Sequence, residues 1–477
     1  MTGKPFIKLF HTPNSAYFLD VNRNEILQIG ESSYLYLENE IYQLGKKLEI
    51  PTEIVELQNA GYLSTESNIK AVQHPYTRFL TEFLDRKMGK ITLQVTQNCN
   101  FRCKYCIYTP KKNTKQRTHS QKSMSWETAK AAVDFLWNHS VDSKSVNVGF
   151  YGGEPLIEFG LIQKTIKYCK YLFEGKELSF NITCNGSLLT PEVIRFLSRN
   201  SVNLMISLDG PKNINDKNRV FVNGDGTFNK VMEGINLVKQ IDPKFADRLQ
   251  ISMVIDPQNE FDCINQVFIG EKSINRLSVQ PSIVDLDFSE EEIGVSEDYL
   301  LKNTYHQFLA VLSLFERFDK EKVSPIGLKV IESAVNDKEK IGQGSRLMTV
   351  DAPSGPCIPG QLRAFVDVDG RLFPCERVSE TSSSMQIGDI YNGFRVENTL
   401  EILNVAQLSS EECKICWGFR YCNQCAKAAM DKTNSISAAE RLKHCDDSRR
   451  EAYHRISQYL LLQEIPRYYN KQIINRN

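Results

Sequence analysis

Three cysteines lie close together in the stretch QNCNFRCKYCIYTP, as Cys99, Cys103 and Cys106. Their C-x3-C-x2-C spacing bends a loop so that the three thiolates converge on one face of a metal centre. Four thiolates would complete a tetrahedral zinc site. Three thiolates leave one iron of a [4Fe–4S] cube open to another ligand. The stretch therefore favours an iron–sulfur cluster. The alternative is part of a zinc knuckle, which would need a fourth ligand that this loop does not offer.

A second group of cysteines lies near the other end of the chain, at Cys357, Cys375, Cys413, Cys416, Cys422, Cys425 and Cys445. The chain has thirteen cysteines, an odd number that does not suit a disulfide framework. Thiolates grouped in this way in a reducing compartment usually hold metal. The three cysteines outside the two groups, Cys169, Cys184 and Cys263, are predicted to be buried apolar side chains.

The bulk properties exclude several classes of protein. A length of 477 residues fits about three domains. The formal net charge is zero, so nothing indicates a nucleic acid or an anionic membrane as partner. The sequence contains no apolar stretch long enough for a spanning helix, and its first residues lack a signal peptide. The predicted location is the cytoplasm.

Between residues 90 and 282, six short apolar runs alternate with helical patterns. This alternation predicts an α/β fold with a partial (β/α)6 barrel of the TIM type. In such folds, the chemistry takes place at the carboxyl ends of the strands. The cysteine loop and the stretches GGEP, TCNGS and SLDGP all fall at predicted strand ends.

Together these motifs resemble the radical S-adenosylmethionine (SAM) enzymes. In that family the open iron is chelated by the methionine part of SAM, and one electron cleaves SAM to a 5′-deoxyadenosyl radical. The resemblance implies that Tyr105 lies against the adenine and that GGEP approaches the methionine, with a carboxylate for its ammonium group. An arginine suits the methionine carboxylate. The implied SAM contacts are Tyr105, Gly152, Gly153, Glu154, Thr183, Asn185, Ser207 and Arg219.

The C-terminal cysteines resemble the SPASM domain of peptide- and protein-modifying radical SAM enzymes, which binds two auxiliary [4Fe–4S] clusters. The resemblance implies three clusters in all, held as follows: Cys99, Cys103 and Cys106 on the SAM cluster; Cys357, Cys375 and Cys425 on the first auxiliary cluster; Cys413, Cys416, Cys422 and Cys445 on the second. One departure is that two residues, not three, separate Cys422 from Cys425. Two structural zinc sites are the alternative.

The first auxiliary cluster is one cysteine short. Fully ligated relatives have a further cysteine where this chain has Asp351. Either Asp351 supplies an oxygen ligand, or the iron is open to a substrate thiolate. An open iron would hold a peptide cysteine deprotonated beside a carbon radical, as thioether formation needs.

Four segments are expected. Residues 1–72 combine short strands with two helical patterns and predict a winged-helix-like module, of the kind that binds the leader of a precursor peptide along an edge strand. The others are a radical SAM partial barrel (90–320), a SPASM domain (345–455) and a C-terminal tail (456–477).

The sequence thus predicts a radical SAM peptide maturase that forms a cysteine thioether in a ribosomally made, cysteine-rich precursor peptide. The implied partners are this peptide with its leader and an electron donor of the flavodoxin or ferredoxin type. No catalytic side chain is assigned beyond the cofactor. The alternatives are carbon–carbon cross-linking or residue oxidation, as in sulfatase maturation, and, in a different class, a zinc-binding winged-helix regulator.

Overall fold

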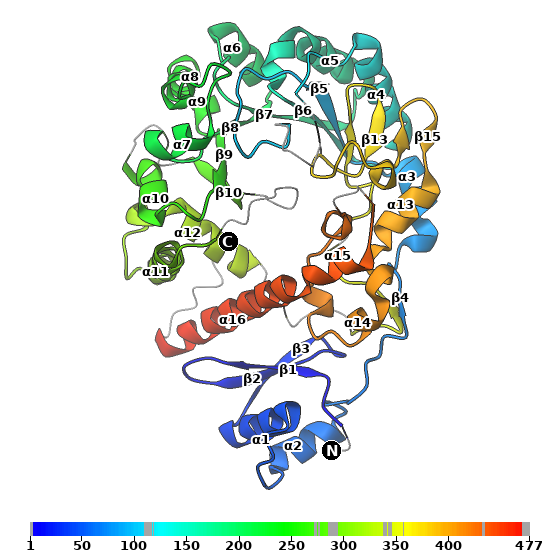
Figure 1. The fold of residues 1–477 in the computed structure, drawn as a ribbon, viewed down its shortest axis with the longest axis vertical. Coiled ribbons are helices and arrows are strands. Elements are labelled where there is room, and N and C mark those ends of the chain that lie inside the picture. Colours follow the sequence, from blue (N-terminus) through cyan, green and yellow to red (C-terminus); the bar gives the residue numbers. More distant parts are fainter. Residues whose placement is uncertain are drawn as a thin grey trace.

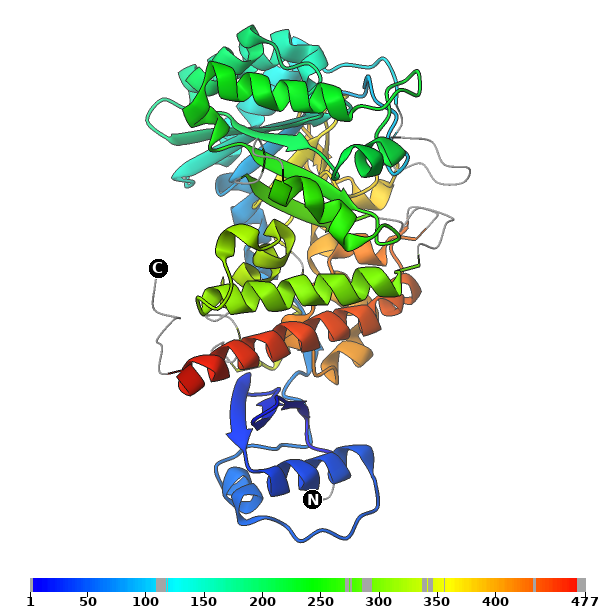
Figure 2. The same ribbon diagram turned by 90° about the vertical axis from the view of Figure 1, so that its left-hand side faces the viewer.

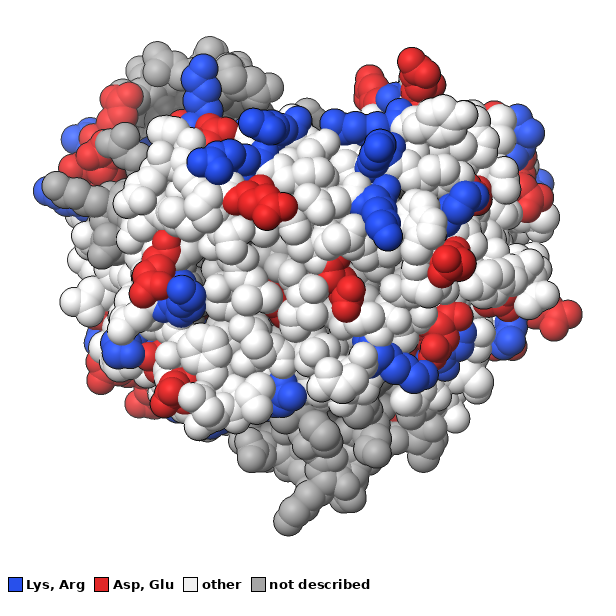
Figure 3. All heavy atoms as spheres, turned by 90° about the horizontal axis from the view of Figure 1, so that it is seen from above, with Lys and Arg blue, Asp and Glu red and all other residues white. Residues whose placement is uncertain are grey.

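The protein is elongated, with an α/β body at one end and a small N-terminal sheet at the other (Figures 1 and 2). In the computed structural model, the described residues are 3–108, 117, 119–270, 274, 277–284, 294–336, 341, 346–355, 357–431 and 435–469. Within these ranges, no helix combines the length and the apolar character needed to cross a bilayer. The face in Figure 3 carries both acidic and basic side chains among uncharged ones, and the basic ones gather along its upper part.

The α/β body contains six parallel strands in the order β10-β9-β8-β7-β6-β5, which confirms the six predicted strands. The strands are β5 (Lys90–Thr96), β6 (Ser145–Gly152), β7 (Glu177–Cys184), β8 (Asn203–Ser207), β9 (Gln250–Ile255) and β10 (Ser278–Ile283). The intervening helices are α4 (Trp126–His139), α5 (Phe159–Leu172), α6 (Pro191–Arg199), α7 (Lys212–Asn218), α8 (Phe228–Ile241), α9 (Pro243–Ala246) and α10 (Phe261–Gly270). Amphipathic helices such as α4 and α5 cover the outside of the curved sheet (Figure 1).

The sequence did not predict that the C-terminal part extends this sheet. Strand β12 (Ala364–Val366) pairs in parallel with β5, and three antiparallel strands follow it. They are β13 (Arg371–Phe373), β14 (Gly388–Asp389) and β15 (Gly393–Phe394). Phe365 and Phe373 are buried in the same core as the barrel strands. The segment around Cys375 is therefore anchored next to the strand that leads into the first cysteine group.

The N-terminal residues form an antiparallel sheet, β1 (Ile7–His11), β2 (Ala16–Asp20) and β3 (Glu25–Ile29), followed by α1 (Glu31–Tyr42) and α2 (Thr52–Asn59). One face of the sheet packs on these two helices through Phe18 and Leu37. The other face packs on the C-terminal helix through Phe10 and Leu19. A short strand, β4 (Ala71–Val72), then pairs in parallel with β11 (Val350–Asp351).

The remaining helices connect these parts: α3 (Leu80–Arg86), α11 (Glu297–Leu314), α12 (Pro325–Asn336), α13 (Val396–Leu403), α14 (Ser410–Lys414), α15 (Ala438–Lys443) and α16 (Cys445–Tyr469). Helix α16 runs between the N-terminal sheet and the rest of the molecule in both views (Figures 1 and 2). The segment expected as a C-terminal tail is thus helical as far as Tyr469, and residues 470–477 lie outside the described residues.

Candidate active site

The first cysteine loop begins where β5 ends. Cys99 and Cys103 are buried and Cys106 is half-buried. Burial is the main cause that raises the pKa of the Cys99 thiol to about 12, and the charges of Glu154, Cys106 and Cys103 act in the same direction. Burial likewise raises the pKa of Cys103 to about 11. Each of these two pKa values is raised in part by the negative charge of other cysteines of the loop. A bound iron cluster would stabilise all three as thiolates. The donor set fits the predicted cluster.

The GGEP stretch packs against the backbone at the start of this loop. Gly153 N donates to Thr96 O at 2.9 Å, and Glu154 N donates to Asn98 O at 2.8 Å. A Cβ atom on Gly152 would lie 2.2 Å from Thr96 O, and one on Gly153 would lie 2.2 Å from Asn98 O. We expected the glycines to admit the methionine of SAM. In the structure, their nearest neighbour is the cysteine loop itself, so they also fix where that loop starts.

Glu154 places a buried carboxylate beside the loop. One oxygen accepts from Asn185 N at 2.6 Å and the other from Leu156 N at 3.0 Å. Burial raises the pKa of Glu154 to about 7, and this effect outweighs the two backbone hydrogen bonds and the attraction of Arg219. A nearby ammonium group would stabilise the charged carboxylate and so offset the free-energy cost of its burial. The site therefore suits the cationic end of the methionine moiety of SAM.

Arg219 forms a buried network on the other side of the loop. Its Nη1 donates to the Tyr105 hydroxyl at 2.8 Å, and that hydroxyl donates to Asp209. Arg219 Nε is buried and makes no hydrogen bond to a described residue. It is thus available to a carboxylate, whereas the Tyr105 hydroxyl is already occupied. Asp209 is not among the site residues that the sequence predicts, although it stands in the SLDGP motif at a strand end.

The other expected SAM contacts lie nearby in the fold. The Asn185 side chain donates to Asn100 Oδ1 at 2.8 Å and accepts from Ser187, which connects the TCNG turn to the cysteine loop. Thr183 pairs with Met205 between β7 and β8, and Ser207 ends β8 beside Ser252 of β9. Thr183 and Ser207 are half-buried, and the hydrogen bonds of the described residues do not connect them to the network around Arg219. The remaining cysteines differ in burial: Cys169 and Cys184 are buried as predicted, whereas Cys263 is only half-buried.

Four of the C-terminal cysteines, Cys413, Cys416, Cys422 and Cys445, line one pocket, together with Gln424, Arg441 and Ser448. Ser448 Oγ donates to Cys422 Sγ at 3.4 Å, and Gln424 Nε2 donates to Cys445 Sγ at 3.6 Å. Hydrogen bonds of this kind tune the sulfur ligands of iron–sulfur clusters. The four cysteines are those expected on the second auxiliary cluster.

The other three C-terminal cysteines are Cys357, Cys375 and Cys425, and the charge of one raises the pKa of another. Burial is the main cause that raises the pKa of Cys375 to about 11, and the charges of Glu376, Cys425 and Cys357 act in the same direction. Asp351 is 1% exposed, and its carboxylate accepts from Arg420 Nη2 at 2.8 Å and from Ala352 N at 2.9 Å. Within the described residues, no group of three His, Cys, Asp or Glu side chains is close enough to hold a single metal ion.

Comparison with known proteins relates the part of the chain that carries the first cysteine loop to a known superfamily. Residues 93–263 match the model of the Radical SAM superfamily. A cysteine-type anaerobic sulfatase-maturating enzyme of Clostridium perfringens is 25% identical over 73% of this chain and 91% of its own length. The radical SAM cyclopropyl synthase TigE of Paramaledivibacter caminithermalis is 24% identical over 72% of this chain and 68% of its own length.

A solved structure, native anSMEcpe with bound AdoMet, shares the fold with a TM-score of 0.58 at 20% identity, over 79% of this chain and 99% of that chain. The chain therefore carries a region, residues 93–263, that matches the Radical SAM superfamily, and it is similar over most of its length to anaerobic sulfatase maturases and to a cyclopropyl synthase. Members of this superfamily use SAM and a [4Fe–4S] cluster.

Proposed function

We propose that this radical SAM enzyme matures a ribosomally made, cysteine-containing precursor peptide in the cytoplasm by forming a thioether cross-link. Cys99, Cys103 and Cys106 would hold the SAM cluster, with Glu154 and Arg219 on the two charged groups of the methionine moiety. When bound, cluster and SAM supply a 5′-deoxyadenosyl radical that takes a hydrogen atom from a peptide carbon.

The observation that carries the proposal is the pairing of Asp351 with Arg420. Cys357, Cys375 and Cys425 provide three thiolates for the first auxiliary cluster, and both oxygens of Asp351 already accept hydrogen bonds. A carboxylate held in this way is poorly placed to become a fourth ligand. The proposed ligand of that iron is a thiolate of the substrate.

The reaction balances as a two-electron oxidation of the peptide. A C–H and an S–H bond are lost and a C–S bond forms. One hydrogen atom ends on 5′-deoxyadenosine, and the thiol proton leaves when the thiolate binds. The electron that cleaves SAM would come from the reduced SAM cluster, which an electron donor of the flavodoxin or ferredoxin type recharges. Of the two electrons that the peptide loses, one leaves with the hydrogen atom, and the other would leave through the auxiliary clusters to a partner of the same type.

The N-terminal sheet is the proposed leader-binding element. β1 and β3 are its outer strands, and an extended peptide could add to either edge. Because the opposite face of the sheet is fixed to α16, a bound leader would be held at a constant position relative to Cys445, the first residue of that helix.

A second candidate function is oxidation of a protein cysteine, because the similarity to the sulfatase-maturating enzyme extends over 73% of this chain. Both functions begin with abstraction of a hydrogen atom from a peptide carbon by the same radical. In thioether formation that carbon belongs to the residue that the cysteine sulfur attacks, and the sulfur stays in the product. In cysteine oxidation it is the carbon that bears the sulfur, and water would hydrolyse the resulting thioaldehyde to an aldehyde with loss of hydrogen sulfide.

The experiment is anaerobic reconstitution with iron and sulfide, followed by incubation with SAM, reductant and candidate cysteine-rich peptides. About twelve irons per chain are expected for three cubes, and about eight when Cys99, Cys103 and Cys106 are all alanine. A product that has lost two hydrogen atoms and a thiol that can be alkylated supports the thioether. An aldehyde that reacts with hydrazines supports the second candidate, and zinc in place of iron contradicts both.

A further inference from the structure

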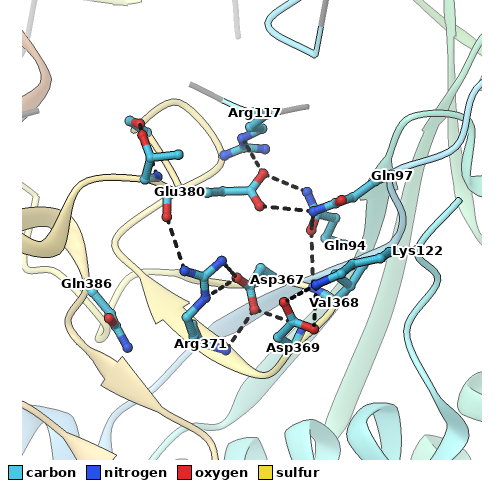
Figure 4. A network of polar contacts seen from close by, with 12 residues as sticks. Gln94, Gln97, Arg117, Lys122, Asp367, Val368, Asp369, Arg371, Glu380 and Gln386 are labelled. Carbon is cyan, nitrogen blue, oxygen red and sulfur yellow. Dashed lines mark hydrogen bonds and ion pairs between the residues drawn. The ribbon is translucent and has the colours of Figure 1, made fainter. Parts of the chain in front are cut away.

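A buried arginine connects the first cysteine loop to the segment that follows Cys375. Arg117 stands after that loop, and its Nε lies 3.0 Å from Oε1 of Glu380. The arginine side chain is fully buried and that of Glu380 is 5% exposed. Arg117 Nη2 also donates to Val378 O at 3.2 Å. Figure 4 shows this pair where the two segments meet.

The surroundings of Arg117 come from several elements. Its guanidinium carbon lies 4.3 Å from the centre of the Phe365 ring on β12, and the rings of Tyr108 and Tyr151 lie 5.7 and 5.8 Å away. Such rings attract a cation through their faces. Gln94 on β5 donates to Glu380 Oε1 at 2.7 Å. One guanidinium thus lies next to three parts of the fold. They are the end of the cysteine loop (Tyr108), the end of β6 (Tyr151) and the C-terminal extension of the sheet (Phe365).

A stabilising role alone does not account for this arrangement. Arg117 Nε and Nη1 are buried and make no well-directed hydrogen bond to a described residue. A buried ion pair is often no more stable than apolar side chains of the same volume, so its use here points to specificity of arrangement. What the pair specifies is the position of one cysteine-bearing segment relative to another.

We propose that Arg117 is a positioning residue that fixes, through Glu380, the loop of Cys99, Cys103 and Cys106 against the segment after Cys375. The effect of this positioning on the reaction rests on the proposed function. Hydrogen abstraction and sulfur attack must reach the same peptide carbon, so the two segments must keep one spacing. When the spacing is lost, SAM is still cleaved but less of the radical leads to product.

The chain offers a matched control. Lys122 and Asp369 also join the segment after the first cysteine loop to the C-terminal extension of the sheet, here at the turn between β12 and β13. Lys122 Nζ lies 3.0 Å from Asp369 Oδ2, but the two side chains are 61% and 51% exposed. Both pairs appear in Figure 4. Exposed pairs contribute little to structure. Glu380→Gln removes the charge that Arg117 faces, Asp369→Asn removes the exposed counterpart, and Arg117→Lys keeps the charge but not the planar fork.

The test compares these three holoenzyme variants with the wild type. The first measurement, which needs no peptide, is hydrogen–deuterium exchange at Ser120–Met124 and at Val378–Glu380. In Glu380→Gln we expect the exchange rate of both segments to rise by about tenfold. The rise should be smaller in Arg117→Lys, and the rate should not change in Asp369→Asn. Equal exchange in Glu380→Gln and Asp369→Asn would overturn the proposal. Should Glu380→Gln not fold, the comparison of Arg117→Lys with Asp369→Asn decides in the same way.

The second measurement is the amount of 5′-deoxyadenosine formed per cross-linked peptide. We expect this ratio to rise by about tenfold or more in Glu380→Gln at unchanged iron content. A purely stabilising pair would lower the thermal stability and leave the ratio unchanged, which would contradict a positioning role. If the wild type makes no cross-linked peptide, the proposed function fails, while the exchange measurement still decides on the pair.

Discussion

Oδ2 of Asp351 lies 2.8 Å from Nη2 of Arg420, and this pair joins β11 to the turn that leads into Cys422. Asp351 is 1% exposed and Arg420 is 23% exposed at its side chain. The pair connects the segment before Cys357 with the cysteine quartet. It also occupies the one carboxylate that the sequence offers as a fourth ligand of the first auxiliary cluster.

Replacing Asp351 by cysteine tests whether that iron is open. Asp351→Cys puts a thiol where the resemblance to SPASM domains implies a further cluster ligand, so we expect unchanged iron content and loss of thioether formation. Electron paramagnetic resonance of the reduced protein should change on addition of a cysteine peptide in the wild type and not in this variant. Asp351→Asn is the control, which should still bind the thiol but lose about 2 kcal/mol of stability as Arg420 loses its partner. A peptide-dependent spectrum in Asp351→Cys would contradict the open iron.

The raised pKa of Glu154, about 7, predicts how SAM binding depends on pH. The folded, SAM-free protein keeps this carboxyl protonated up to about pH 7, so the carboxylate that attracts the SAM ammonium forms only above it. We expect the affinity for SAM to rise between pH 6 and pH 8 towards a plateau. In Glu154→Gln the affinity should fall by about 10- to 100-fold and lose this pH dependence.

Equilibrium dialysis of SAM at three pH values measures this effect, with Glu158→Gln as the control from the same turn. The same shift has a consequence for stability. Between the ordinary carboxyl pKa and 7, the folded state binds more protons than the unfolded state at this site. The contribution of Glu154 to the free energy of unfolding therefore falls as the pH rises through that interval. A SAM affinity that is equally pH-dependent in Glu154→Gln would assign the titration to another group.

The glycines of GGEP give a prediction about the cluster loop. In Gly153→Ala the new Cβ would meet the Asn98 carbonyl oxygen at 2.2 Å, and backbone cannot move aside as a flexible side chain can. We expect the loop to shift, with loss of about four irons and of SAM cleavage. The matched control is Gly160→Ala, near the start of α5, where a Cβ meets nothing within 4 Å. Iron content measured on both variants decides: a normal value in Gly153→Ala would mean that the close approach does not position the loop.

The sequence predicts those parts of the structure that local pattern determines. Buried strands such as β5 and β6 are apolar runs between helical patterns, and C-x3-C-x2-C and GGEP lie at their carboxyl ends. The six parallel strands, and the edge of the sheet that carries the site, are therefore predictable from the sequence alone. Strands of two or three residues, such as β12 to β15, are too short to show a period. The Arg117–Glu380 and Asp351–Arg420 pairs join residues far apart in the chain, and such pairings leave no local signal.

Phe10 gives a final prediction, on the attachment of the N-terminal sheet. Its ring is buried, stacks on Tyr453 of α16 with ring centres 5.0 Å apart, and meets Trp417 edge-on at 6.2 Å. Because a large buried ring is lost, Phe10→Ala should lower the free energy of unfolding by about 3–5 kcal/mol. It should also change the fluorescence of Trp417 and speed hydrogen exchange along the face of α16 around Tyr453.

The control is Leu35→Ala on α1, a side chain that is 44% exposed and should change stability by less than about 0.5 kcal/mol. Leader binding adds a second measurement, since a sheet loosened from α16 could still bind a leader but would no longer deliver the peptide core to one place. Phe10→Ala should therefore keep leader affinity and lose cross-linked product. Loss of affinity with normal turnover at saturating peptide would instead show that Phe10 takes part in recognition.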